Sequence, residues 1–148
     1  MQRSIKVLFI ILFLFLSLQA NCKTLFLNVY LQRVIDGDTY LVLYHDLPIR
    51  VRAKDIDTFE IHKTKHLLKQ EKETNLNEKE IFKRGLVATQ FVKQFEHKFL
   101  CLEIDTKHYL DFYGRYLGVL YPVNCYQLDN TTKSINDMLR EQHLTIEK

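Results

Sequence analysis

The sequence predicts an α+β fold, mainly β, in which five short strands close into a small barrel with helices packed on it. One observation behind this prediction is that apolar, β-branched and aromatic residues fill five short runs. The other is that stretches with helical spacing follow the third and the fifth of these runs. Five strands that close on themselves, with a helix after the third, form the pattern of the oligonucleotide-binding barrel.

The first three runs form a β-meander. Residues 24–35 are rich in Leu, Val, Phe and Tyr, and the dipeptide Asp36-Gly37 predicts a tight turn after them. Strand-forming residues resume over 38–45, and a second turn is expected at 46–48. Residues 49–52 alternate between apolar and basic side chains, which indicates a third strand.

The clearest helix spans residues 77–97. Asn77 is placed to cap it, with Glu80 as the capping-box partner. Spacings of three and four residues predict that its core-facing side consists of Phe82, Leu86, Thr89, Val92 and Phe95.

The remaining elements complete the barrel. Residues 99–105 and 115–123 are the fourth and fifth strands, and residues 132–144 form a second helix. Residues 60–77 are heavily charged and predict a long mobile loop, with one helical turn as the alternative. His62 and His66 lie in this loop four residues apart, and its composition favours solvated side chains over a metal site.

Composition narrows the possible functions. A chain of 148 residues is long enough for one domain with a hydrophobic core. Its four glycines cannot build a G-x-G-x-x-G or Walker loop, and no G-x-S-x-G or H-E-x-x-H motif occurs. These absences argue against nucleotide-binding α/β folds, α/β-hydrolases and zinc proteases.

The N-terminus predicts export. A basic start with Arg3 and Lys6 precedes an apolar stretch over 7–18, which is too short for a comfortable membrane span. Residues 1–20 are therefore expected to be a signal peptide. Cleavage after Cys22, a lipid-anchored Cys22 and an uncleaved anchor are the alternatives. The predicted location is periplasmic or extracellular, with or without a membrane anchor.

Without residues 1–20, which contain two basic and no acidic residues, the formal charge falls from +3 to +1. Nucleic-acid binding therefore cannot be argued from net charge and depends on local placement. Of the three cysteines, Cys101 lies in the fourth strand and Cys125 follows the fifth, so these two either pair with each other or both remain free.

Three short segments carry candidate chemistry. In the first, Val-Ile-Asp-Gly-Asp-Thr, Asp36 suits the turn, whereas Asp38 begins a strand, where an acid is disfavoured. In the second, Arg52 is followed by Asp57 and Glu60. Asp55 and Asp57 share strand parity and are expected on one face; carboxylate and carbonyl oxygens are ligands that Ca²⁺ accepts.

The third segment is Asp-Phe-Tyr-Gly-Arg. Its arginine, Arg115, starts a strand and can contact a phosphate with two N–H groups at once. The surface ion pair is the alternative for this arginine.

The motifs I-D-G-D-T, R-x-x-x-x-D-x-x-E and Y-G-R, in this order, resemble those of the staphylococcal (micrococcal) nuclease, or thermonuclease, family. The resemblance covers residues 31–144. It implies a Ca²⁺-dependent enzyme that hydrolyses DNA and RNA with little sequence preference and leaves 3′-phosphate ends. The implied partner is nucleic acid, with single strands favoured, and the implied state is a monomer.

The resemblance also implies roles for individual residues. Asp38, Asp57 and the carbonyl of Thr58 would hold Ca²⁺, and Glu60 would act as the general base. Two arginines and a tyrosine would contact the substrate: the phosphorane-like transition state would be stabilised by Arg52 and Arg115, and a neighbouring phosphate would be bound by Tyr113.

The chain departs from the family at several positions. Phe59 replaces a usual proline, Asp55 a usual glycine or apolar residue, and Phe112 a frequent lysine. Residues 60–77 form a longer connection than usual, and the domain predicted over 24–148 is expected to be truncated at its C-terminus. A non-catalytic nucleic-acid-binding barrel and a degenerate, inactive copy are the alternative functions.

Overall fold

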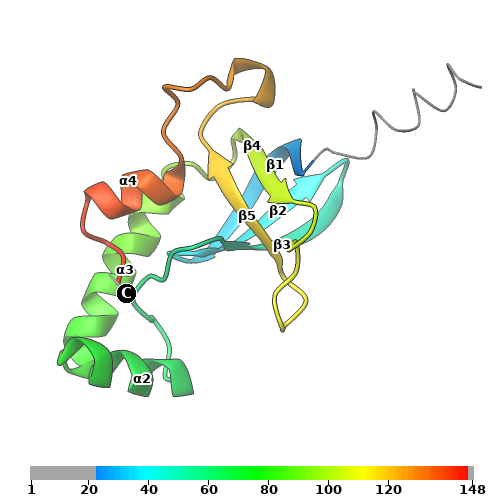
Figure 1. Ribbon diagram of the computed structural model, residues 1–148. Helices are drawn as coiled ribbons and strands as arrows, with labels where there is room; N and C mark the ends of the chain where they lie inside the picture. Colours follow the sequence, from blue (N-terminus) through cyan, green and yellow to red (C-terminus); the bar gives the residue numbers. More distant parts are fainter. Residues whose placement is uncertain (1–22, 147–148) are drawn as a thin grey trace, which may run out of the picture.

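The computed structural model describes residues 23–146, which form a closed five-stranded barrel with three helices on one side of it (Figure 1). The strands are β1 (Thr24–Asp36), β2 (Thr39–Tyr44), β3 (Leu47–Ala53), β4 (Phe99–Asp105) and β5 (Tyr116–Tyr121). The helical elements are α2 (Lys65–Thr74), α3 (Glu78–Lys93), α4 (Ile135–Glu141) and a short 3₁₀ turn, η2 (Cys125–Gln127). The predicted α+β fold, mainly β and resembling an oligonucleotide-binding barrel, is confirmed.

The barrel closes because β1 pairs along both of its halves. The strand order is β1-β2-β3-β5-β4, and every neighbouring pair is antiparallel except β3 and β5. The half of β1 from Thr24 to Tyr30 pairs with β4, and the half from Tyr30 to Asp36 pairs with β2. Two register shifts in the second half are irregularities of the kind that bend a strand around a barrel.

The second predicted turn is present but lies earlier in the chain than residues 46–48. The chain reverses at His45 and Asp46, whose φ angles of 46° and 65° fit the left-handed turn that joins tightly twisted strands. Pro48 therefore lies inside β3, opposite Leu43. Asn-Gly and Asp-Gly are the usual sequences for such turns, so the sequence His-Asp did not indicate a turn at this position.

The core fills the barrel and continues under α3 and α4. Buried apolar side chains come from all five strands, from Ala88 and Val92 of α3 and from Ile135 and Leu139 of α4. Burial of this continuous apolar surface is the main favourable term for folding.

Helix α3 confirms its predicted cap and corrects its predicted face. The Asn77 side chain accepts a hydrogen bond from the Glu80 backbone N–H at 2.9 Å. Leu86, however, is 59% exposed, and the buried positions are Ile81, Gly85, Ala88, Thr89 and Val92. The helix turns its smallest residues inward, because a Cβ on Gly85 would lie 2.5 Å from the Phe59 carbonyl oxygen.

The pairing of Cys101 with Cys125, one of the two alternatives from the sequence, is present. It joins the buried Cys101 of β4 to η2. No helix within residues 23–146 is long and apolar enough to cross a membrane. The predicted signal peptide, residues 1–20, and its alternative cleavage position at Cys22 lie outside the described residues.

We expect Cys125→Ala to lower the free energy of unfolding by about 3 kcal/mol, because a cross-link that closes a loop of this length restricts the unfolded chain. Urea denaturation of the oxidised protein measures the change. Reductant should destabilise the wild type by a similar amount and leave the variant unaffected. Equal stability of the oxidised and reduced wild type would contradict the prediction.

Candidate active site

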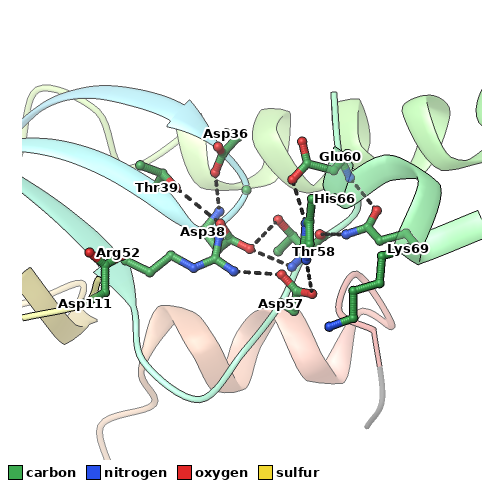
Figure 2. A network of polar contacts seen from close by, with 12 residues as sticks. Asp36, Asp38, Thr39, Arg52, Asp57, Thr58, Glu60, His66, Lys69 and Asp111 are labelled. Carbon is green, nitrogen blue, oxygen red and sulfur yellow. Dashed lines mark hydrogen bonds and ion pairs between the residues drawn. The ribbon is translucent and has the colours of Figure 1, made fainter. Parts of the chain in front are cut away.

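Five of the predicted site residues meet in one polar network, between the β1–β2 turn, the end of β3 and the segment that follows β3 (Figure 2). These residues are Asp38, Arg52, Asp57, Thr58 and Glu60. Residues that are 22 positions apart in sequence are thereby brought together at one end of the barrel.

The carboxylate of Asp38 lies at the centre of this network and is only 2% exposed. Its Oδ2 accepts hydrogen bonds from the backbone N–H and the hydroxyl of Thr58 at 2.7 and 3.0 Å. Its Oδ1 contacts the Arg52 guanidinium and accepts from the Thr39 hydroxyl at 3.3 Å. Burial raises the pKa of the Asp38 carboxyl to about 7, although Arg52 acts in the opposite direction.

One guanidinium joins the two carboxylates that were predicted to hold a metal. Arg52 Nη1 contacts Asp38 Oδ1, and Arg52 Nη2 lies 2.7 Å from Asp57 Oδ1. Asp57 is itself buried. Both acids therefore point at a single cationic group, which is the convergence that a shared cation site requires.

The prediction that Asp55 and Asp57 face the same side is wrong. Strand β3 ends at Ala53, so strand alternation does not extend to these residues. Asp55 has φ 59° and is exposed, whereas Asp57 is buried. Asp55 therefore contributes no carboxylate to the network.

Apolar packing holds the segment that carries Thr58 and Glu60. Phe59 is buried and packs with Leu67 and Ile81 in a small cluster separate from the barrel core. The β1–β2 turn approaches the same segment closely, because a Cβ on Gly37 would lie 2.7 Å from Thr58 Oγ1. The phenylalanine that departs from the family pattern thus anchors this segment.

The connection predicted to be a mobile loop contains the ten-residue helix α2. Thr64 caps it by accepting a hydrogen bond from the Leu67 backbone N–H at 3.2 Å, and Asn75 ends it in the left-handed region with φ 55°. Leu67 and Gln70 are its buried residues. Charged side chains on the other positions hid this short buried face from a composition-based prediction.

Helix α2 brings two further residues to the site. The side-chain amide of Gln70, which is fully buried, donates to the Thr58 carbonyl and accepts from the Glu60 backbone N–H, both at 2.9 Å. His66 Nδ1 lies 2.9 Å from Glu60 Oε1, and its Nε2 lies 3.4 Å from Asp57 Oδ2. The prediction of a solvated His66 is wrong, although His62 is exposed.

Arg115 lies next to the acidic network. Its Nη1 donates to the Thr39 hydroxyl at 3.4 Å, and that hydroxyl donates to Asp38. Its Nε donates to Asp111 Oδ2 at 2.7 Å, so the predicted surface ion pair and the proximity to the acids are both present. The backbone N–H groups of Tyr113 and Arg115 also donate to Asp111.

Two aromatic rings extend from the same loop into solvent. Phe112 is 97% exposed, and Tyr113 is 78% exposed. The Arg115 guanidinium lies 5.5 Å from the centre of the Tyr113 ring. Tyr113 is thus beside Arg115 and not among the carboxylates.

A groove with a volume of about 940 Å³ borders the network. Its lining includes three arginines and the last part of the described chain: Arg52, Arg84, Arg140, His143, Thr145 and Ile146. Arg84 also pairs with Glu80, and Arg140 with Asp137. Asp55 and Asp57 line the groove as well, so guanidinium and carboxyl groups face it together.

The donor atoms at this site fit Ca²⁺. Asp38 and Asp57 supply carboxylate oxygens, and the Thr58 carbonyl keeps one lone pair beyond its bond to Gln70. Within residues 23–146, no group of three or more His, Cys, Asp or Glu side chains is arranged to hold a metal. Calcium takes about six to eight oxygen ligands, so water or phosphate oxygens would have to complete the set that two acids and one carbonyl begin.

No protein-family model and no curated protein matches this chain significantly.

We expect Gln70→Leu to lower the free energy of unfolding by about 2–4 kcal/mol, because it leaves the Thr58 carbonyl and the Glu60 N–H without a buried partner. Thermal and urea denaturation measure the effect. Gln90→Leu, at an exposed position of α3, is the matched control and should change stability by less than about 0.5 kcal/mol. Equal effects of the two substitutions would contradict the prediction.

Proposed function

We propose that this protein is a Ca²⁺-dependent phosphodiesterase of the staphylococcal nuclease type that hydrolyses DNA and RNA with little sequence preference. One observation carries the proposal: Asp38, Arg52, Asp57, Thr58 and Glu60 form one network, and Arg115 joins it through Thr39. Acids, a carboxylate base and two guanidinium groups are the components that phosphodiester hydrolysis needs.

Glu60 is the proposed general base. Its carboxylate is partly exposed, whereas Asp38 and Asp57 are buried. A carboxylate that water reaches can accept a proton from an attacking water molecule as the oxygen–phosphorus bond forms. Among the described residues, Glu60 Oε1 contacts His66, and Oε2 has a single long contact of 3.4 Å from Thr64 Oγ1. We therefore assign the proton transfer to Oε2.

The two arginines stabilise the negative charge that develops on the phosphate oxygens. Guanidinium N–H groups placed where charge increases during a reaction lower the barrier. Asp38, Asp57 and the Thr58 carbonyl would hold Ca²⁺, which would supply further positive charge to the reaction. Arg52 contacts both acids, so it is close enough to act on a phosphate held at these residues.

The exposed rings of Phe112 and Tyr113 support a preference for single strands. Aromatic side chains next to a cationic group bind unpaired bases by stacking, irrespective of sequence. A base inside a duplex does not present its face for stacking. The proposed substrate class is therefore single-stranded or locally unpaired nucleic acid. We propose that the protein binds it as a monomer.

Export fits the covalent chemistry of the barrel. Disulfides persist in oxidising compartments and are rare in the cytosol. The pair Cys101–Cys125 agrees with the export that the predicted signal peptide implies. We therefore propose a periplasmic or extracellular location, with or without a membrane anchor.

Purified protein should cleave denatured DNA and RNA with Ca²⁺ and lose this activity in a chelator. Glu60→Gln and Arg115→Ala should each lower kcat by about 10²–10³-fold, as loss of one group that stabilises the transition state typically does. Gel assays and single-turnover kinetics measure the loss. Glu73→Gln and Arg33→Ala, both at exposed positions, are the matched controls and should retain full activity.

Two results would overturn this proposal. Retained nucleic-acid binding without cleavage would assign the protein to the non-catalytic barrels. A folded protein that neither binds nor cleaves nucleic acid would be the degenerate copy.

Phe112→Ala should weaken binding of a single-stranded oligonucleotide about 10- to 100-fold, because stacking contributes about 1–3 kcal/mol per base. Fluorescence anisotropy in a Glu60→Gln background, with Ca²⁺ present, measures binding without turnover. Tyr126→Ala is the matched control, because its ring is also exposed but lies in η2. The Cys125 N–H of η2 bonds to Asn28, in the half of β1 that pairs with β4 and not in the half that leads to the site. An equal effect of both substitutions would contradict the stacking role.

A further inference from the structure

Helix α2 presents one polar face to the site. His66 and Gln70 are four residues apart and therefore lie one above the other on the helix. Leu67, between them, is buried with Phe59 and Ile81 and fixes the orientation of this face. The network in Figure 2 shows His66 in contact with the same short segment that Gln70 binds.

Gln70 fixes the backbone on both sides of Phe59. Its amide nitrogen donates to the Thr58 carbonyl, and its amide oxygen accepts from the Glu60 N–H. A fully buried amide with both ends engaged has one orientation. The Cα of Glu60 is therefore set by the helix, and only its side-chain torsions remain to be restrained.

His66 restrains those torsions. Its Nδ1 lies 2.9 Å from Glu60 Oε1, a hydrogen-bond distance, whereas its Nε2 is 3.4 Å from Asp57 Oδ2. The imidazole ring is rigid, so its two nitrogens face two carboxylates across a fixed separation. With Oε1 engaged, Glu60 keeps Oε2 for other partners, and within residues 23–146 its one contact there is the long one from Thr64.

We propose that His66 is a positioning residue that orients Glu60 relative to Asp57 for the hydrolysis of phosphodiesters, an inference that rests on the proposed function. His66 comes from α2, the helix in the long connection between β3 and α3. His66 acts through Glu60 and does not itself contact the phosphate. Removing it leaves the base present but no longer aimed at one position.

The test uses the full-length protein and compares three substitutions. His66→Ala should lower kcat about 10- to 100-fold, the typical loss when a residue that orients a functional group is removed. KM for a single-stranded DNA substrate should stay within about twofold. His66→Asn places an amide nitrogen near the position of Nδ1 and should recover most of kcat. His66→Gln places its amide nitrogen nearer to Nε2 and should not.

The control and the second readout separate positioning from folding and from metal binding. Leu68→Ala changes an exposed residue on the opposite side of α2 and should retain full activity. Calorimetric titration of metal-free His66→Ala with CaCl₂ should give an affinity within about threefold of wild type. A purely structural role would instead lower melting temperature in all three variants and give no difference between Asn and Gln.

The outcomes separate the role of His66 from the proposed function. An active wild type with an equally active His66→Ala variant overturns this inference and leaves the proposed function intact. Equal activities of the Asn and Gln variants overturn it as well, including the case in which the alanine variant fails to fold. A wild type without Ca²⁺-dependent cleavage removes the proposed function, and this inference with it.

Discussion

The geometry of the site depends on the contacts that the buried carboxylate of Asp38 makes. This carboxylate binds a side chain from β3, Arg52, and the backbone N–H and hydroxyl of Thr58. Burial raises the pKa of this carboxyl, and the contacts with Arg52 and Thr58 act in the opposite direction. Removing one partner of a buried ionic pair typically costs about 3–5 kcal/mol. The β1–β2 turn, the end of β3 and the segment after it are therefore held in one arrangement.

Close packing completes this arrangement from the apolar side. A Cβ on Gly37 would meet Ala88 of α3 at 2.9 Å, and one on Gly85 would meet the Phe59 and Glu60 carbonyls at 2.5 and 2.6 Å. Small residues at these points let the turn, the helix and the backbone approach one another, because a larger side chain would push them apart. The position of the proposed base is thus set by glycines far from it in sequence as well as by its polar contacts.

The sequence predicted the barrel, because strand alternation and turn dipeptides are local signals. The convergence of the acids and Arg52 was expected from the resemblance to the nuclease family and not from any local signal. Prediction from the sequence failed at α3, where Gly85 and Ala88 form the buried face and hydrophobicity favoured Leu86. It also failed at α2. That helix buries Gln70 only because the Thr58 carbonyl and Glu60 N–H lie opposite, and no periodicity in the chain reveals backbone groups supplied by another segment.

The two sides of the site are held by different means, and the difference bears on function. The acidic side is fixed by burial, whereas the loop of Arg115 is fixed by hydrogen bonds to Asp111. Because Asp111 holds that loop without a covering layer, Phe112 stays 97% exposed and contributes almost no buried apolar area to folding. The stability of the fold therefore gives no reason for an aromatic residue at position 112. The proposed function supplies one, because a nucleic-acid base beside Arg115 would stack on the ring and cover it.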